Sequence, residues 1–257
     1  MVSRRRFSLP LLLLFCCLSC QKKDETGSLI LNFQTKVDTQ SIEYHSLQYE
    51  NAAGNIFQVD EVKFFISQVI LHSTSGNLVS IVDNDGLHYY DSNLPNTFSW
   101  TIQDALPEGL YDSIFFVMGL SPAQNVTGFF VNPPENNMAW PDVLGGGYHY
   151  MQINGKWLNI NDSLQPFNLH TGLGQVYENG QPTQFVDNSF EVKLSLKNLK
   201  IEVAQTAQRT LVMDVNNWFN SPHVYDLNEW GGAIMQNQAA QQTLRENGHD
   251  VFAIVEK

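Results

Sequence analysis

The side chains best suited to chemistry lie within residues 132–174, where two histidines stand at the ends of two expected strands. His149 lies near the start of the first strand and His170 near the end of the second. Imidazole is a common ligand for copper and zinc, and a thioether favours Cu(I). Met138 and Met151 are therefore further candidate ligands. These four side chains form a metal site only if the fold brings them together.

The elements around the two histidines offer a way to do so. A turn over 159–163 would pair 148–153 with 165–170 as a hairpin and place the start of one strand beside the end of the other. If the register puts both rings on one face, His149 and His170 converge on one ion. The alternative is that each histidine is a hydrogen-bonded, partly buried residue without a ligand.

Few other motifs compete with this pair. The other histidines lack grouped ligands, and we expect surface or structural roles for them; they are His45, His72, His88, His223 and His249. All three cysteines lie in the first twenty residues, so the folded part has neither a thiolate metal site nor a disulfide. The Gly-x-Ser-x-Gly, phosphate-loop, His-Glu-x-x-His and dinucleotide motifs are missing from the sequence. Paired catalytic carboxylates leave no local spacing, so a hydrolase stays an open alternative.

Composition and charge limit the class of protein. The chain has 257 residues, 43% hydrophobic and 16% charged, which favours an ordered domain over a disordered chain. Its sixteen Phe, nine Tyr and five Trp residues favour strands. The net charge of −12 becomes about −15 (−12 minus 3) if the arginines at 4–6 are removed with a leader. This acidity argues against nucleic acid as a partner and suits a protein that attracts cations.

The N-terminus predicts export and lipidation. Basic residues 4–6 precede an apolar run over 9–18, which is typical of a signal peptide and too short to span a bilayer. The run ends in Ser19-Cys20, which resembles a bacterial lipoprotein signal with Cys20 as the lipidated residue. An ordinary secretory signal is the alternative. We therefore expect a signal peptide over 1–19, a tether over 20–27 and one domain over 28–257.

The hydrophobic pattern predicts a mainly β domain, an antiparallel β-sandwich with a short C-terminal helix; a barrel is the alternative. Residues 83–86 contain an Asp-Gly pair and predict a hairpin between the strands 78–82 and 87–90. The helix is expected over 233–247, ended by Gly248. The other expected strands are 29–33, 62–71, 111–120, 148–153, 165–170, 190–196, 211–215 and 251–255.

Short segments over most of the mature chain carry a resemblance to a known family. They are Gly27–Phe33, Lys63–Ser67, Gly109–Tyr111, Phe116–Leu120, Met138–Asp142, Gly147–Met151, Asn154–Gly155, Leu169–Gly172, Gly231–Asn237 and Glu246–Phe252. In this order they resemble the MbnP-like copper-binding proteins, in particular lipoprotein members from Bacteroidetes-type bacteria.

The resemblance implies a secreted or lipid-anchored β-sandwich of the outer membrane, on its periplasmic or cell-surface side. Family members bind copper through histidines together with a tryptophan that a di-haem, peroxidase-like partner oxidises to kynurenine. Carried onto this sequence, His149 and His170 are the ligands and Trp140 is the candidate oxidised residue, with Met138 or Met151 as alternatives that complete the site. The implied role is copper acquisition or handling, not catalysis.

Two other functions stay open. A non-metal ligand-binding or adhesin-like surface lipoprotein predicts an exposed aromatic platform, for example at Trp100 or Trp157. A hydrolase predicts two carboxylates that face one cleft.

Overall fold

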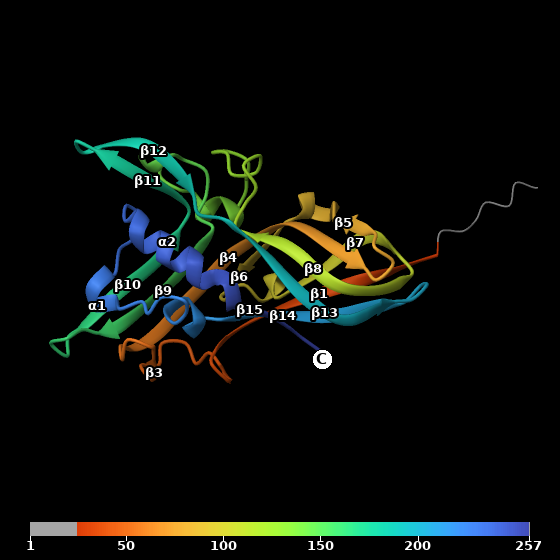
Figure 1. The fold of residues 1–257 in the computed structure, drawn as a ribbon, viewed down its shortest axis with the longest axis horizontal. Helices are drawn as coiled ribbons and strands as arrows, with labels where there is room; N and C mark the ends of the chain where they lie inside the picture. The colour runs from red at the N-terminus through yellow and green to blue at the C-terminus, as the bar shows by residue number, and fades with distance from the viewer. Residues whose placement is uncertain (1–24, 257) are drawn as a thin grey trace, which may run out of the picture.

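The computed structural model describes residues 25–256, so the predicted signal peptide and Cys20 lie outside the described residues. Two large sheets and one small one make up the fold (Figure 1). The eight-stranded sheet contains β3 (Tyr49–Glu50), β4 (Ile56–Ser73), β5 (Leu78–Ser80), β6 (His88–Asp91), β8 (Gly109–Met118), β9 (Met151–Leu158), β10 (Leu164–Thr171) and β13 (Phe190–Ile201). The five-stranded sheet contains β1 (Thr26–Val37), β2 (Gln40–Ser41), β7 (Ser99–Pro107), β14 (Thr206–Asp214) and β15 (Phe252–Val255). The two-stranded sheet is the hairpin of β11 (Leu173–Glu178) and β12 (Gln181–Asp187).

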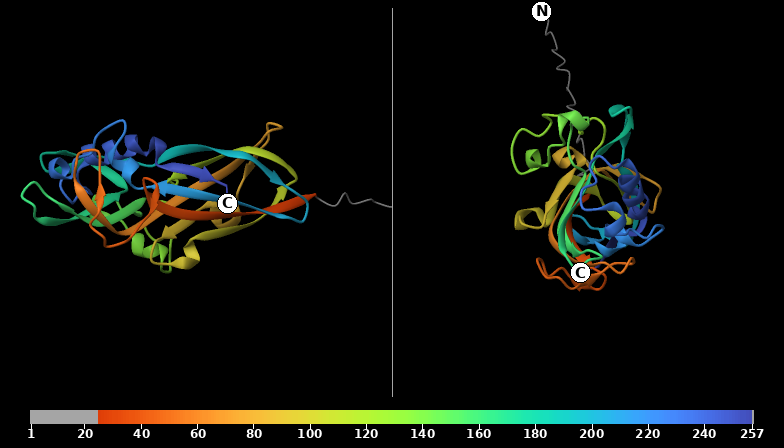
Figure 2. Two further views of the ribbon diagram at one scale, coloured as in Figure 1. Left: turned by 90° about the horizontal axis from the view of Figure 1, so that it is seen from below. Right: turned by 90° about the vertical axis from the view of Figure 1, so that its left-hand side faces the viewer.

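Short helices connect these strands. The α-helices are α1 (Leu227–Trp230) and α2 (Gln238–Asn247). The 3-10 helices are η1 (Asp83–Gly86), η2 (Pro95–Thr97), η3 (Glu135–Met138), η4 (Asp142–Leu144), η5 (Asn216–Phe219) and η6 (Gly248–Asp250). The views in Figures 1 and 2 agree that α1, α2 and the β9–β12 hairpins gather at one end of an elongated molecule, opposite the start of β1. None of the helices in the described part is long and apolar enough to cross a membrane.

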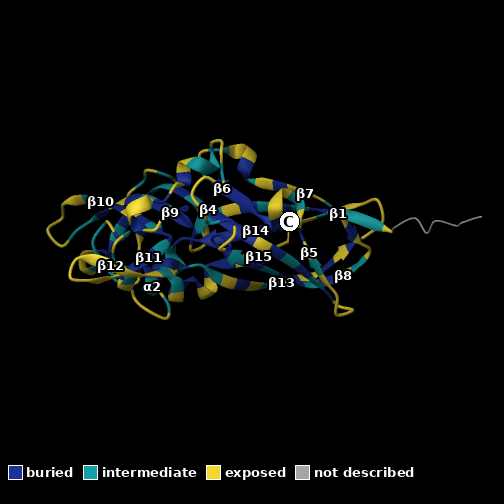
Figure 3. Cartoon of the chain, turned by 90° about the horizontal axis from the view of Figure 1, so that it is seen from above, coloured by how far each residue is buried: buried dark blue, intermediate teal, exposed yellow. Residues whose placement is uncertain are grey.

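The predicted β-sandwich is confirmed. One buried core takes alternate residues from both large sheets, such as Leu29 and Leu31 of β1 and Phe64 and Ile66 of β4. Because side chains alternate across a strand, each of these strands presents one face to this core. Buried segments accordingly fill the middle of the molecule in Figure 3, and exposed ones lie at its loops. Among the paired strands of the described chain, β1 and β14 run parallel and the others antiparallel.

A second, smaller core lies on the other side of the eight-stranded sheet. Its members are Phe65, Leu87, Tyr89, Leu120, Met138, Tyr148 and Tyr150. Phe65 follows Phe64 on β4, so the two residues point to opposite faces of the sheet. The segment from η3 to η4, residues 135–144, therefore covers part of the outer face of this sheet, and we call it the covering segment.

Three predicted boundaries change. The hairpin predicted over 83–86 is wrong. β5 and β6 do not pair with each other, because each pairs antiparallel with β4, and η1 lies in the connection between them. The helix begins at Gln238, not at 233, because Asn237 caps it: the Asn237 side chain accepts a hydrogen bond from Ala240 N. Strand β1 begins at Thr26, three residues before the expected strand start at 29.

Candidate metal centre

The β9–β10 hairpin brings the two predicted histidines together. Met151 pairs with Thr171 and Leu158 with Leu164, and the turn over 159–163 closes with a 3.0 Å hydrogen bond from Asn159 N to Ser163 O. The ring centroids of His149 and His170 are 4.9 Å apart, with the ring planes at 89°. The predicted convergence of these two rings is therefore present in the fold.

Trp140 also packs against His149. The two ring centroids are 4.7 Å apart at 73°. Trp140 is only 2% exposed, and its Nε1 donates a hydrogen bond to Leu144 O at 3.2 Å. Gly172 makes room for it, because a Cβ there would lie 2.8 Å from the indole ring. Trp140, His149 and His170 form what we call the ring cluster.

A tight chain reversal places Trp140 beside His149. Trp140 N donates to Gly147 O at 2.9 Å, and an isolated bridge joins Ala139 to Tyr148. The run between them, Gly145–Gly147, has φ of +110°, +69° and +81°, a region that favours glycine. At Gly147 a Cβ would also lie 2.3 Å from Asn125 Oδ1. The glycine run is therefore what lets the covering segment fold back over the cluster.

His149 keeps one ring nitrogen free for a ligand. Its Nδ1 lies 2.8 Å from Met138 O, and since a carbonyl only accepts, Nδ1 carries the proton. Nε2 then has a lone pair, and it is buried without a hydrogen-bond partner within residues 25–256. Burial lowers the pKa of His149 to about 4, against weaker raising effects of its backbone hydrogen bonds. The ring is thus neutral at pH 7 and can coordinate a metal.

His170 is also held neutral. Burial lowers its pKa to about 3, with smaller contributions from the charges of His149 and Lys63. Its Nε2 lies 2.8 Å from Asn154 Oδ1. The buried, unpartnered Nε2 of His149 and the neutral ring beside it fit copper, for which imidazole is a suitable ligand.

The two predicted methionine ligands do not join the cluster. Met151 is fully buried in the core between the sheets, whereas Asn154, the partner of His170, points to the opposite face of β9. Met138 packs in the second core, and its backbone carbonyl is what contacts His149. Of the four proposed metal residues, the structure therefore brings together His149, His170 and Trp140 but not Met151.

The remaining histidines lie elsewhere, in structural or surface positions. His45, His72, His223 and His249 each pair with a carboxylate, and His88 stacks between Phe33 and Trp100. Within residues 25–256, no three His, Cys, Asp or Glu side chains form a metal-binding group. A tryptophan platform at Trp100 or Trp157 is contradicted, because each is only 6% exposed.

Sequence reasoning missed the polar residues next to His170. Asn154 Nδ2 donates to Glu61 Oε2 at 2.9 Å, and Glu61 Oε1 lies 2.7 Å from Lys63 Nζ. Asn93 Nδ2 donates to the same Oε1 at 2.7 Å. The signal available in the sequence was weak: Asn154 directly follows the expected strand 148–153, and its partner on β4 depends on a register that the sequence does not show.

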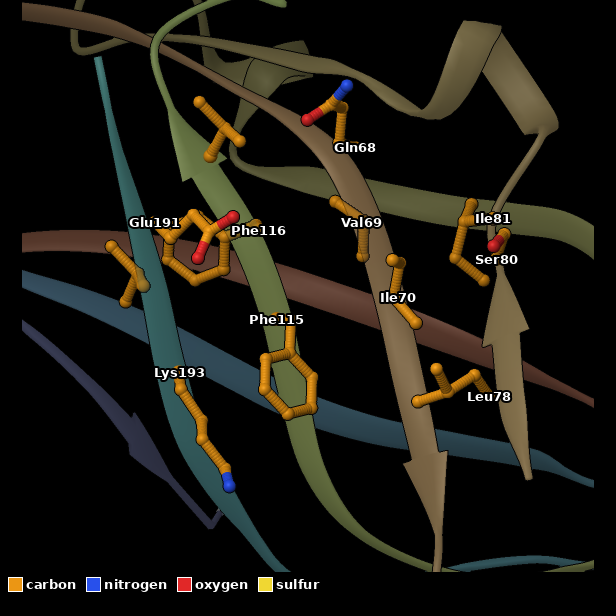
Figure 4. A pocket seen from close by; sticks show the side chains of 12 residues that line it. Gln68, Val69, Ile70, Leu78, Ser80, Ile81, Phe115, Phe116, Glu191 and Lys193 are labelled. Atoms are coloured by element: carbon orange, nitrogen blue, oxygen red, sulfur yellow. The ribbon is translucent and has the colours of Figure 1, made fainter. Parts of the chain in front are cut away.

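A separate groove lies on the outer face of the eight-stranded sheet, where β4, β5, β8 and β13 meet (Figure 4). Its volume is about 770 Å³. Ile70, Leu78 and Phe115 supply apolar walls, and the Nζ of Lys193 lies 5.1 Å from the centroid of the Phe115 ring. None of the three residues of the ring cluster lines this groove.

The fold and the cluster define a class: a β-sandwich whose outer sheet face carries two neutral, neighbouring imidazoles and a covering indole. The chain belongs to the MbnP family, whose sequence profile matches residues 26–236. MbnP from Methylosinus trichosporium has a similar structure, with a TM-score of 0.55 and 14% identity over 90% of this chain and 98% of that one. At this identity the likeness shows a shared fold. Comparison with curated proteins gave no match.

Proposed function

We propose that this protein binds copper through His149 Nε2 and His170, beside the indole of Trp140. The observation that carries the proposal is the buried Nε2 of His149, which has no hydrogen-bond partner among the described residues and belongs to a ring 4.9 Å from that of His170. A buried polar atom without a partner is costly, and a bound ion would satisfy it. The MbnP family is linked to copper handling, which supports copper over other metals.

The charges around the cluster favour this role. Both histidines stay neutral at pH 7, so binding an ion there displaces few protons. Lys63, the nearby cation, is paired with Glu61 at 2.7 Å and lies 3.9 Å from Asp91. Its positive charge is therefore largely compensated. The acidic chain as a whole attracts cations.

We further propose a binding role, not a catalytic one. Glu61, the carboxylate nearest to His170 in the hydrogen-bond network, already accepts from Lys63, Asn93 and Asn154 and is not free to act as an acid or base. In this proposal the protein is anchored to the outer membrane through Cys20, on its periplasmic or cell-surface side, and acquires or handles copper. A di-haem, peroxidase-like partner that oxidises Trp140 belongs to the same proposal.

The direct test is a Cu(I) titration of purified protein against a chromophoric chelator. We expect one equivalent to bind to the parent and binding to be lost in His149→Phe and His170→Phe, which keep a ring of similar size. His72→Phe is the matched control, since His72 is a partly exposed histidine of β4 paired with Asp112 at 2.9 Å. Parent-like binding in both cluster variants would mean that the site lies elsewhere.

The modification of Trp140 is tested on protein made in its own host. Intact-mass and peptide analysis would locate kynurenine at Trp140, together with bound copper. An unmodified Trp140 in copper-loaded native protein would remove the oxidised residue and its partner from the proposal but leave the histidine site.

The groove of Figure 4 favours a second candidate, the binding of an apolar, non-metal ligand. Its apolar walls suit an apolar ligand, and β13 lines it with both Lys193 and Glu191. The probe 1-anilinonaphthalene-8-sulfonate should bind the parent and lose fluorescence with Phe115→Ala. Phe185→Ala is the control, because Phe185 is an exposed aromatic residue on β12, away from the groove. Equal dye binding in both variants would argue against this candidate.

A further inference from the structure

The two histidines of the ring cluster are held by different nitrogens. His149 Nδ1 is committed to Met138 O, which leaves Nε2 facing its surroundings without a partner among the described residues. His170 is committed through Nε2 instead, at 2.8 Å from Asn154 Oδ1. The cluster is therefore asymmetric, and the asymmetry depends on which atom of the Asn154 amide faces His170.

Glu61 decides the orientation of that amide. The oxygen and nitrogen of an asparagine side chain are assigned from their hydrogen-bond partners. The other end of the Asn154 amide lies 2.9 Å from Glu61 Oε2. A carboxylate accepts, so the amide NH₂ faces Glu61 and the amide oxygen faces His170. His170 Nε2 must then carry the proton.

Glu61 is itself held as an acceptor. Its Oε1 receives Lys63 Nζ at 2.7 Å and Asn93 Nδ2 at 2.7 Å, while its Oε2 receives Asn154. Three donors from β4, β9 and the loop after β6 thus point at one carboxylate. As a carboxylate in an ion pair with Lys63, Glu61 accepts at both oxygens, so the direction of the hydrogen bonds from Asn154 to His170 is fixed.

We infer that Asn154 and Glu61 are positioning residues that hold His170 as its Nε2–H tautomer, so that the cluster offers Nε2 of His149 and Nδ1 of His170 to a ligand. Hydrogen bonds from a metal-binding histidine to its neighbours commonly fix the tautomer and the ring orientation. The metal-binding consequence rests on the proposed function. The tautomer itself is a property of the metal-free protein and can be read without copper.

The first measurement is a long-range ¹H–¹⁵N correlation spectrum of ¹⁵N-labelled, metal-free protein, which distinguishes protonated from bare ring nitrogens. We expect a protonated Nδ1 in His149 and a protonated Nε2 in His170. A protonated Nδ1 in His170 would overturn the inference, whether or not the protein binds copper. If the tautomers are as stated and copper does not bind, the proposed function fails and the tautomer assignment stands.

Glu61→Gln tests whether Glu61 sets the orientation of the Asn154 amide. A glutamine can donate to the oxygen of Asn154, so the Asn154 amide can turn over and present its NH₂ to His170 Nε2. We expect the proton of His170 to move, wholly or in part, to Nδ1 in this variant. A loss of packing alone would not change the tautomer in this direction, and an unchanged Nε2–H spectrum would overturn the role of Glu61.

Asn154→Leu tests the effect on the ligand atom. We expect the ¹⁵N chemical shifts of the His170 ring to be averaged between its two tautomers. We also expect metal binding to weaken by on the order of 10- to 100-fold, the usual cost of losing such a partner. Silver(I), a diamagnetic substitute for Cu(I), should change the ¹⁵N chemical shifts of His149 Nε2 and His170 Nδ1 in the parent. Asn168→Leu is the matched control, because Asn168 lies directly opposite Asn154 on β10. Parent-like shifts and affinity in Asn154→Leu would overturn the role of Asn154.

Discussion

His88 gives a sharp test of how the sandwich is held together. Its ring lies between Phe33, 4.2 Å away at 15°, and Trp100, 5.6 Å away at 10°. His88 belongs to β6 of the eight-stranded sheet, and its two neighbours belong to β1 and β7 of the five-stranded sheet. Its Nε2 donates to Thr97 O at 2.7 Å. The neutral ring thus joins the two layers.

Burial lowers the pKa of His88 to about 4 from 6.5, outweighing the hydrogen bond to Thr97, which raises it. The unfolded chain therefore takes up a proton at this histidine as the pH falls below 6.5, while the folded protein takes it up only near pH 4. Above pH 6.5 the protonation of His88 leaves the free energy of unfolding unchanged. Between pH 6.5 and about pH 4 the free energy of unfolding declines as the pH falls. Between pH 7 and pH 5 the loss through this one group is about 2 kcal/mol, from 1.36 kcal/mol per pKa unit.

Urea unfolding of the metal-free protein at pH 7, 6 and 5 measures this effect. His88→Gln lowers stability at pH 7 because it breaks the stack, but its loss between pH 7 and pH 5 should be about 2 kcal/mol smaller than that of the parent. Phe33→Leu is the control, since it weakens the same stack and keeps the histidine. The reasoning is refuted if His88→Gln and the parent have the same pH dependence.

Three further predictions concern the ring cluster and the residues around it. Gly172→Ala should lower the free energy of unfolding by about 1–3 kcal/mol, because its methyl group would meet the Trp140 ring at 2.8 Å; a negligible change in urea unfolding would contradict this packing. Met151→Leu should cost less than about 1.5 kcal/mol and leave copper affinity as in the parent, since Met151 packs in the core; weaker copper binding in a chelator competition would return Met151 to the site. Free Cu(I) at 100 times its dissociation constant should stabilise the parent by about 2.7 kcal/mol and not stabilise His170→Phe. Thermal unfolding before and after addition of a chelator checks this last point.

The sequence was sufficient for much of the fold because alternation reports directly on burial. Leu29, Leu31 and Phe33 alternate with less buried residues and form one face of β1, as the pattern predicts. The pairing of β5 and β6 could not be predicted from the sequence. The Asp-Gly pair at 85–86 predicts a local reversal, but whether two strands pair with each other or with a third depends on β4, which is distant in sequence.

The site shows the same division between local and distant information. The convergence of His149 and His170 could be predicted because a short turn fixes which ends of a hairpin meet. Met151 was predicted to lie beside His149 because both were expected in one strand. In the structure β9 begins at Met151 and the chain bends at Tyr150, so the alternation of faces along β9 does not extend to His149. Glu61 was missed because its contact with Asn154 follows a bulge in the β4–β9 pairing between Val59 and Glu61.

The position of the cluster explains how one domain can contain both an apolar core and a polar site. Placed between the sheets, each of the two imidazoles would need a hydrogen-bond partner within a layer of Leu, Ile and Phe side chains, as His88 has in Thr97 O. On the outer face, His170 reaches Asn154 and Glu61, whose further partners lead to the surface, while the segment carrying Trp140 excludes water from His149. The covering segment therefore desolvates the site without removing its polar support. Loosening that segment should expose His149 and weaken ligand binding before it affects the stability of the sandwich.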